Sequence, residues 1–325
     1  MQVFTDLAQV PDGFGPSAVT IGNFDGVHRG HQAVLGRLVR LARADDYVAV
    51  AVTFDPHPAV VHRPATAPEL LTGLTDRLDL LTDTGLDAVL VVPYSLGFAA
   101  QDPEEFVTRY LTGALGARSV VVGHDVRFGR DNSGTLATMV ELGGAHGFEV
   151  VAIDDVGECQ AEATGSRQRW SSSAVRALLA EGDVAQAADI LGRPHRVRGT
   201  VVHGDARGRE LGFPTANLGA IAGLVPADGV YAGWLRRPAL AEQEPGHPDV
   251  RLPAAISIGT NPTFDGVERR VEAYVLDRTD LDLYDEQVVL EFVEHLRPTL
   301  RFDGIEPLVH QMHDDVARAR VVLGP

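Results

Sequence analysis

Five short apolar runs recur in the first half of the chain, with helix-like segments between them. They are AVTIG around Val19, YVAVAVTF around Val50, AVLVVPY around Val91, RSVVVG around Val121 and FEVVAI around Val150. A strand that is apolar on both faces needs cover on both faces, which a parallel sheet flanked by crossover helices provides. The pattern therefore predicts a doubly wound parallel sheet of the α/β class. The segment after His31 fits one covering helix, because Val34, Leu38 and Leu41 repeat at helical spacing.

From Arg193 onward the pattern changes to strand-like runs without a long helix between them. The runs are HRVRGTVVH, GVYAGWL, PAAISIG, RVEAYVL and QVVLEF, with Gly, Pro and Asp in the intervals. Such a succession predicts an antiparallel barrel or sandwich, and we carry the barrel forward as the expectation. The Pro- and Glu-rich segment 237–251 is interpreted as a surface loop. A terminal helix is expected to pack on the barrel through one apolar stripe, formed by Ile305, Leu308, Val309, Met312 and Val316.

The length of 325 residues favours two domains, each with a core of its own. Between the two patterns lies SSSAVRALLAEGDVAQAADILG, in which serines can cap a first turn and Gly182-Asp183 separates two short helices. Taking that break as the limit predicts domains of residues 1–183 and 184–325.

The composition restricts the partners that the chain can have. Asp and Glu total 45 against 28 Lys and Arg, which gives a formal net charge of -17. This field repels nucleic acid, so no nucleic-acid partner is expected, and any phosphate site has to be built from local donors. No run approaches the roughly 20 apolar residues that cross a bilayer, and the first residues do not resemble a signal peptide. With Cys159 as the single cysteine, a cytoplasmic protein without a membrane partner is expected.

The stretch TIGNFDGVHRGHQAVL carries chemistry in the first half. An apolar strand ends at Ile21, a glycine-containing turn follows, and His28 and His31 stand where a helix begins. Helix N-termini present unpaired N–H groups and a partial positive charge, so they attract phosphate. Two histidines can add donors there, and Gly30 lets a nucleotide approach the backbone closely. A chance pair of surface histidines is the alternative, and the placement between strand and helix favours an ATP site.

The run GDARGRELGFPTANL is the most specific string in the second half. Its three glycines, Gly204, Gly208 and Gly212, make a turn-rich loop whose backbone donors can hold phosphate. Thr215 and Asn217 are two residues apart on an extended segment, so they point the same way and offer two oxygen ligands for Mg²⁺. A plain hairpin with a glycine-rich turn is the alternative.

These strings and several others, in order, resemble the bacterial bifunctional riboflavin kinase/FAD synthetase family. The further matches are VTFDPHP, VVGHDVRFG and WSSSAVR in the first half and SIGTNPTF, RRVEAYVLD, DLY and EFVEHLR in the second. The resemblance spans residues 18 to 322 and implies a Rossmann-like nucleotidyltransferase fold followed by the kinase barrel. It also implies the activities: riboflavin phosphorylation to FMN by the C-terminal half, and FMN adenylylation to FAD, with release of pyrophosphate, by the N-terminal half.

The resemblance implies roles for particular residues. His28, His31 and Glu272 would be catalytic, the histidines at the α-phosphate of ATP and the glutamate as base for the 5′-hydroxyl of riboflavin. ATP would contact Gly22, Phe24, His28, His31, Ser172, Ser173 and Arg176 in the adenylyltransferase, and FMN would contact Asp125, Arg127 and Phe128. ATP or flavin would contact Gly204, Gly208, Arg209, Gly212, Pro214, Thr215, Asn217, Asn261 and Arg297 in the kinase, with Mg²⁺ on Thr215 and Asn217.

Some of these residues have plainer interpretations. Ser171 to Ser173 read equally well as helix caps, which use the same N–H groups as a phosphate site, and Ser173 and Val175 stand where the family usually has Thr and Ile. Without the resemblance, Glu272 is one strand carboxylate among many. Glu272 alternates with Val271 and Ala273 along the strand, which places its side chain off the apolar face.

The expected small-molecule partners are riboflavin, FMN, FAD, ATP, ADP and pyrophosphate, and a homo-oligomer is compatible with the sequence. Three other functions compete with this interpretation. A monofunctional enzyme would keep one half as a scaffold, and a flavin-binding regulator would bind flavin without consuming ATP. Another nucleotidyltransferase would explain the first half and leave GRELGFPTANL without a purpose.

Overall fold

The computed structural model describes the chain except residues 154–157, 161–166, 205–207, 209–210, 264–265 and 325, and it gives the backbone alone in the rest of 158–169 and 261–268. Two compact units make up the chain: Met1–Glu69 with Leu74–Glu158, and Leu70–Gly73 with Cys159–Pro325. The helices after Ser171 thus pack with the second unit. The predicted limit at residues 183 and 184 therefore does not coincide with the limit between the packing units. As a division between the two activities it stays a prediction.

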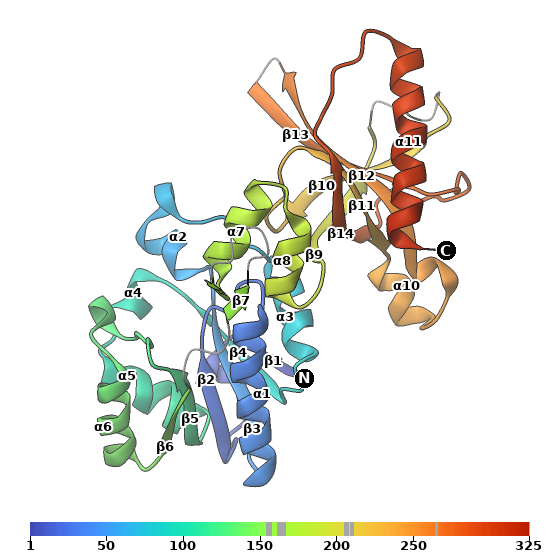
Figure 1. Ribbon diagram of the computed structural model, residues 1–325. Helices are drawn as coiled ribbons and strands as arrows, with labels where there is room; N and C mark the ends of the chain where they lie inside the picture. Colours follow the sequence, from blue (N-terminus) through green and yellow to red (C-terminus); the bar gives the residue numbers. More distant parts are fainter. Residues whose placement is uncertain (154–157, 161–166, 205–207, 209–210, 264–265, 325) are drawn as a thin grey trace. The chain divides into compact units, whose positions relative to one another are not determined.

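The first unit is built on a six-stranded parallel sheet with the order β1-β4-β3-β2-β5-β6 (Figure 1). Its strands are β1 (Gln2–Phe4), β2 (Ser17–Ile21), β3 (Val48–Asp55), β4 (Ala88–Pro93), β5 (Ala117–Gly123) and β6 (Glu149–Ile153). The predicted parallel α/β sheet is confirmed, with all five apolar runs as strands. The short edge strand β1 was missed because its burial pattern is mostly exposed and it has no apolar run.

Alternate residues of the strands supply two separate cores, one on each face of the sheet. Val50 and Val52 belong to the core that includes Phe106 and Met139, whereas Ala49 and Ala51 belong to the core that includes Leu35, Leu38 and Leu80. The helices on the first face are α5 (Pro103–Phe106), the π-helical η3 (Val107–Ala114) and α6 (Leu136–His146). Those on the second face are α1 (Arg29–Ala44) and α3 (Leu74–Thr82). Burial on both faces explains why the strands are apolar throughout.

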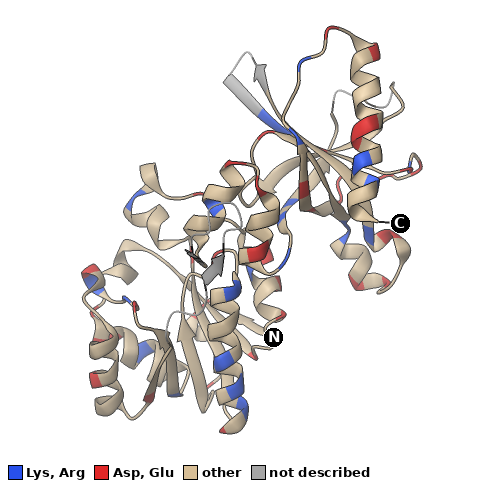
Figure 2. Cartoon of the chain, in the orientation of Figure 1, with Lys and Arg blue, Asp and Glu red and all other residues tan. Residues whose placement is uncertain are grey.

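Short elements fill the connections of this unit. They are η1 (Leu7–Gln9), α2 (Pro58–His62), η2 (Pro64–Thr66), α4 (Leu96–Ala99) and η4 (Arg130–Asn132). Strands β7 (Glu158–Gln160) and β8 (Arg167–Arg169) form a separate two-stranded sheet. Figure 2 shows the blue colour of Lys and Arg along the ribbon of α1, whereas β2 and β4 have no charged residue. Charge is thus kept off these two strands.

The second unit is a closed barrel with the strand order β10-β13-β12-β11-β14-β9, and its described pairs are antiparallel. Its strands are β9 (His195–Val202), β10 (Thr215–Ala222), β11 (Gly229–Arg236), β12 (Arg251–Thr263), β13 (Gly266–Val275) and β14 (Gln287–Arg297). The predicted barrel is confirmed. Val271, Ala273 and Val275 lie in its core, so the predicted alternation that turns Glu272 away from the apolar face is confirmed as well.

Two short helices precede the barrel and share its core. They are α7 (Ser172–Ala180) and α8 (Val184–Leu191), and Gly182 with φ +80° forms the break that the sequence predicted. Leu178, Leu179 and Ile190 pack in the barrel cluster, together with Leu71 of the segment Leu70–Gly73. Part of the first half of the sequence is therefore built into the second unit.

The terminal helix α11 (Ile305–Leu323) packs on the outer face of the barrel against β11, β12 and β14 (Figure 1). Its residues Asp315 and Ala319 are buried, whereas Ile305 is 64% exposed. The expectation that Ile305 would join the packed stripe is wrong, because the buried residues of α11 lie in its C-terminal half. Leu308, Met312 and Val316 instead line a cavity.

The segment 237–251 contains α10 (Pro238–Gln243) and the turn η5 (Pro248–Val250), so its interpretation as a loop is wrong. Pro238 occupies the first turn, where its fixed φ suits a helix, and the following ALAEQ consists of helix-favouring residues. The content of Pro and Glu in the whole segment had favoured a loop over this local preference for a helix. None of the helices in the described part of the chain has the length and apolarity to span a bilayer.

Candidate active sites of the two units

The strand order of the first unit creates a natural place for a ligand. From β2 the chain continues to β3 and β4 on one side of β2, and then to β5 and β6 on its other side. In open α/β sheets, ligands bind beyond the carboxyl ends of the strands where the order reverses in this way. The loop after β2 carries Gly22 to His28, and the loop after β5 carries His124 to Gly129. The predicted residues of both loops therefore lie at this switch point.

His28 and His31 are brought together at the N-terminus of α1. His28 is the N-cap, its Nδ1 accepts from the His31 backbone N–H at 3.4 Å, and the two rings stack with centroids 3.7 Å apart. The Phe24 ring meets the His31 ring edge-on at 5.3 Å. Because Nδ1 of His28 accepts, the proton of the neutral ring belongs on Nε2. Two imidazoles thus stand where helix N–H groups already favour an anion.

The surroundings of His31 favour its neutral ring before a ligand arrives. Burial, and then the neighbouring His28, lower the pKa of His31 well below its usual 6.5. His31 as a whole is half-buried, while its Nδ1 is fully buried and has no hydrogen-bond partner in the described structure. An arriving phosphate anion would stabilise the protonated form, so charge can be recruited at the moment of binding.

A buried arginine anchors the loop after β2 to the end of β3. Arg77 of α3 is 1% exposed; it donates from one Nη to the backbone oxygen of Asn23 at 3.1 Å and from the other to Asp55 at 3.4 Å. Burial lowers the pKa of Arg77, while the carboxylates of Asp55 and Asp25 act against this effect. The guanidinium joins the ends of β2 and β3. Reasoning from the sequence missed Arg77, since nothing in LTDRLDLLT separates it from a solvated helix residue.

A cavity of about 490 Å³ opens beside this loop, at the carboxyl end of the sheet. It brings together Gly22, Asp125, Arg127 and Phe128, four of the predicted contacts. Phe128 is buried, whereas Asp125 and Arg127 are exposed at the rim. The cavity therefore has an apolar interior and a charged rim.

Aromatic side chains that the sequence analysis did not single out form the wall of this cavity. They are Phe54 near the end of β3, Tyr94 after β4, Phe98 of α4 and Phe106 of α5. The Phe98 centroid lies 5.3 Å from that of Tyr94, 5.8 Å from that of Phe54 and 6.0 Å from that of Phe106. A flat, apolar ring system fits such a wall. The only sequence signal was that three of the four residues follow or adjoin an apolar strand or a proline turn.

Ser172, Ser173 and Arg176 lie on α7, in the second compact unit. The N-cap is Ser171, whose side chain accepts from the Ala174 N–H at 3.2 Å, so the capping interpretation is correct for Ser171. The contact of the other three residues with ATP stays a prediction. His57 caps the short helix α2 through its Nδ1, which accepts from the Ala59 N–H at 3.1 Å.

In the second unit, the register of the barrel aligns the predicted kinase residues on its outer face. Asn217 of β10 lies opposite Glu272 of β13, which lies opposite Ser257 of β12. Thr215 lies opposite Tyr274 in the neighbouring row. Directly opposed residues on antiparallel strands share a face, so these side chains stand side by side. Two residues 55 positions apart in the sequence thus form one site.

A cavity of about 270 Å³ lies over this face, between the barrel and α11. Its polar members include Thr215, Ser257, Glu272, Arg297 and Asp315. Its apolar members are Leu211, Phe213, Val230, Ala255, Tyr274, Leu308, Met312 and Val316, and Gly208 completes it. A second, smaller hollow of about 50 Å³ adjoins Pro214 and Thr215 from the other side and is bounded by Tyr284. Thr215 therefore belongs to both hollows.

The glycines of this loop are required by close packing. A Cβ on Gly204 would lie 2.5 Å from the Asn217 Nδ2, and a Cβ on Gly208 would overlap the Phe213 carbonyl oxygen. Gly212, at φ +84°, forms the turn before β10. Asn217 donates from Nδ2 to the Thr215 carbonyl at 3.3 Å, which turns its Oδ1 away as an acceptor. Arg209 lies outside the described residues, and of Asn261 only the backbone in β12 is described.

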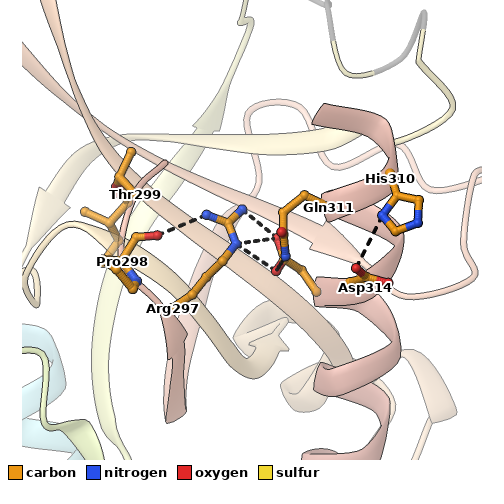
Figure 3. Close-up of polar contacts among 8 residues, drawn as sticks. Arg297, Pro298, Thr299, His310, Gln311 and Asp314 are labelled. Atoms are coloured by element: carbon orange, nitrogen blue, oxygen red, sulfur yellow. Dashed lines mark hydrogen bonds and ion pairs between the residues drawn. The ribbon is translucent and has the colours of Figure 1, made fainter. Parts of the chain in front are cut away.

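Arg297 has a partner that its assignment as a ligand contact did not anticipate. Its guanidinium binds Asp315 of α11 with contacts of 2.6 to 3.0 Å, and it also donates to the Pro298 carbonyl at 3.0 Å (Figure 3). Gln311 Nε2 donates to the same carboxylate at 3.0 Å. Asp315 is 4% exposed, so the pair anchors α11 to the end of β14. Arg297 lines the cavity, while its guanidinium is paired with Asp315 of α11. Its contact with a ligand stays a prediction.

Together these features define the class of protein: a nucleotide-using enzyme with a phosphate-binding α/β unit joined to a barrel with its own polar site. Comparisons with known proteins agree. The family model for FAD synthetase matches residues 12–168, and that for riboflavin kinase matches residues 191–323. The chain belongs to the family of bifunctional riboflavin kinase/FMN adenylyltransferases.

Individual relatives match almost end to end. The curated bifunctional riboflavin kinase/FMN adenylyltransferase of Escherichia coli is 34% identical over 98% of this chain and 96% of its own length. That of Pseudomonas fluorescens is 36% identical over 94% and 93%. A solved structure described as a macrolide-efflux protein from Streptococcus pneumoniae has a TM-score of 0.83, with 30% identity and coverage of 98% of both chains. The whole chain therefore follows the two-domain plan of the family.

Proposed function

We propose that the barrel unit phosphorylates riboflavin to FMN and that the α/β unit adenylylates FMN to FAD, with ATP as co-substrate of both steps. The observation that carries the proposal is that each family match falls largely on one unit, and that each unit holds a cavity lined in part by residues predicted for that activity. The domain limits of 1–183 and 184–325 are part of this proposal. Because both reactions consume ATP, we place the protein in the cytoplasm.

At the barrel site, riboflavin occupies the cavity between α11 and the outer barrel face, and its ribityl 5′-hydroxyl reaches Glu272. The carboxylate takes the hydroxyl proton as the oxygen attacks the γ-phosphorus of ATP, and the bond to the β,γ-bridging oxygen breaks to give FMN and ADP. The ATP lies on the far side of Thr215, toward Pro214 and Tyr284. Glycines 204, 208 and 212 keep the loop close to the phosphates, with Arg209, Asn261 and Arg297 as further contacts.

The chemistry of Thr215 and Asn217 suits Mg²⁺. Both offer neutral oxygens on one strand face, the Nδ2 of Asn217 is occupied by the Thr215 carbonyl, and Glu272 adds negative charge opposite Asn217. Mg²⁺ prefers oxygen ligands and keeps waters and phosphate oxygens in the rest of its shell. When bound, the ion would neutralise charge on the ATP phosphates. We therefore propose Thr215 and Asn217 as its protein ligands.

At the α/β site, a phosphate oxygen of FMN attacks the α-phosphorus of ATP and pyrophosphate leaves. His28 and His31, with the N–H groups of α1, stabilise the charge on the α-phosphate, and Gly22 and Phe24 border the nucleotide. The flavin ring lies against the aromatic wall of the 490 Å³ cavity, next to Phe128, with Asp125 and Arg127 at the rim. Ser172, Ser173 and Arg176 are the further residues that we propose as contacts of the ATP phosphates.

A direct test uses the purified chain with riboflavin, ATP and Mg²⁺, and separates the flavins by liquid chromatography. FMN should appear first and FAD second, both dependent on ATP. The variant His310→Gln is a control that should keep both products, because His310 is exposed on α11 and contacts the exposed Asp314 in the ion pair shown in Figure 3. Unchanged riboflavin, under conditions in which a curated relative converts it, would refute the proposal.

A further inference from the structure

One polar side chain in the wall of the 490 Å³ cavity lacks a partner. Gln101 follows α4 and borders this cavity next to Phe98, Phe106 and Phe128. Its Oε1 is fully buried and has no hydrogen-bond partner, and its amide makes no hydrogen bond to any residue that the structure describes. Its hydrogen bonds are made by the backbone: the Gln101 N–H donates to the Phe98 carbonyl at 3.1 Å, and the Gln101 carbonyl accepts from the Arg130 N–H at 2.7 Å.

Such an amide is costly where it stands. A buried polar atom without a hydrogen bond destabilises the folded state relative to one that is satisfied, and native structures rarely contain one without a reason. Leucine would fill nearly the same volume among these aromatic rings without that cost. The position of the amide therefore points to a ligand that completes its hydrogen bonds.

The other polar groups of the cavity are arranged differently. Asp125, Arg127 and Asn132 are exposed at the rim. Asn23 is held through its backbone oxygen by Thr53 and Arg77. Charged rim groups suit the sugar alcohol and phosphate end of a flavin nucleotide, which leaves the aromatic interior to the ring system. Gln101 adjoins this interior.

We infer that Gln101 is a specificity-determining residue that recognises the pyrimidine edge of the flavin ring in the adenylyltransferase site. This inference rests on the proposed function. The edge of the ring carries an N3–H donor between two carbonyl acceptors. A carboxamide is complementary to it: Oε1 accepts the N3–H while Nε2 donates to a neighbouring carbonyl. A terminal amide rotates readily about its last torsion, so either atom can be presented.

The neighbouring cavity offers the competing explanation. A hollow of about 290 Å³ near Asp6, Leu90 and Arg109 also borders Phe98 and Gln101. Gln101 would then serve only to bind water between two hollows. That role predicts a change in stability without any change in the choice of flavin, so the two explanations separate in an experiment.

The experiment compares FMN with N3-methyl-FMN, which lacks the N3–H donor, as substrates for FAD-type product formation. Wild-type protein should show a KM for the methylated flavin higher by roughly tenfold or more, the factor that about 1.4 kcal/mol corresponds to. Gln101→Leu should raise the KM for FMN toward that of the methylated flavin, so the ratio of the two values falls toward one. Gln243→Leu, an exposed residue of α10, is the control and should keep the wild-type ratio.

The ratio is measured within each variant, so partial loss of folded protein cancels, and riboflavin phosphorylation reports whether the barrel unit is intact. Gln101→Met serves as a second replacement if the leucine variant does not fold. Equal ratios in wild type and in the Gln101 variants would overturn the inference while leaving FAD synthesis, and thus the proposed function, in place. If no variant or wild type forms FAD, the proposed function fails, and fluorescence titration with the two flavins then supplies the same ratio from binding.

Discussion

Asn217 and Glu272 lie directly opposite each other on the antiparallel strands β10 and β13. This pairing places a carboxylate beside the neutral oxygens proposed for Mg²⁺, on the outer face of a closed barrel. The barrel interior holds Val271 and Ala273, so the site is built on a rigid sheet whose other face is fully packed. Acid–base chemistry and metal binding can therefore share one sheet face without disturbing the core.

Replacement of Glu272 by Gln should stop riboflavin phosphorylation. The amide fills the same space but cannot take the hydroxyl proton, and loss of a general base typically costs 10²–10⁴-fold in rate. The measurement is FMN formation from riboflavin at saturating ATP and Mg²⁺. Glu294→Gln is the matched control, because Glu294 is an exposed glutamate on β14 of the same barrel. Near-normal kcat in the Glu272 variant would show that another group acts as the base.

A methyl group at Gly204 should weaken the use of Mg²⁺ and ATP. The new Cβ would lie 2.5 Å from the Asn217 Nδ2, so the Asn217 side chain has to move. We expect Gly204→Ala to raise the Mg²⁺ concentration needed for half-maximal riboflavin phosphorylation by roughly tenfold, corresponding to about 1.4 kcal/mol, the scale of one hydrogen bond. FAD synthesis from supplied FMN should be unaffected. Gly144→Ala, with nothing within 4 Å of its Cβ, should leave both reactions unchanged.

Removal of Arg77 should damage the α/β site alone. Arg77→Met leaves the Asn23 carbonyl and Asp55 without the buried guanidinium that joins them, and loss of hydrogen bonds to a charged group typically costs roughly 1.5–3 kcal/mol. Thermal unfolding should shift downward and FAD formation should fall, whereas riboflavin phosphorylation continues. Arg43→Met removes an exposed pair with Asp87 and should cost at most about 1 kcal/mol. Equal effects of the two changes would contradict the role given to Arg77.

The lowered pKa of His31 should make the α/β unit less stable in mild acid. Its folded pKa lies well below 6.5, so between these two values the unfolded chain binds a proton that the folded chain does not. The stabilisation is fully present above pH 6.5 and is lost as the pH falls below that value. Hydrogen exchange of the α1 amides, measured from pH 7.5 to 5.5 and corrected for intrinsic rates, should show this loss. His31→Gln should remove that part of the pH dependence, and an unchanged slope would contradict the lowered pKa.

Most of the fold could be predicted from the sequence, because burial imposes a periodic pattern of apolar residues that marks the buried faces. Apolar runs such as the one around Val50 reflect cover on both faces of a sheet, and the alternation around Glu272 reflects a barrel wall with one apolar face. The break at Gly182-Asp183 was equally local. Elements without such a mark were missed: β1 is a three-residue edge strand, and α10 lies in a segment rich in Pro and Glu.

The sites were less readable because tertiary structure assembles them. His28, His31, Thr215 and Asn217 stand within short strings and could be proposed directly. Phe54 stands at the end of β3, whereas Phe98 and Phe106 belong to the connection from β4 to β5, and they meet only because β4 lies beside β3 in the sheet. Burial of Gln101 and Arg77 depends on packing that no local pattern records. The partner of Arg297 was hidden for the same reason, since Asp315 lies on α11.

The central claim is that one polypeptide holds two independent ATP-using sites that act in sequence. A mixing experiment tests it most directly, with Glu272→Gln and the double variant His28→Ala/His31→Ala assayed alone and together. From riboflavin, ATP and Mg²⁺, the first variant alone should make no FMN, and the second should stop at FMN. The mixture should form FAD, because FMN released by one protein is used by the other. FAD formation by either variant alone, or a mixture that makes FMN but no FAD, would contradict the account.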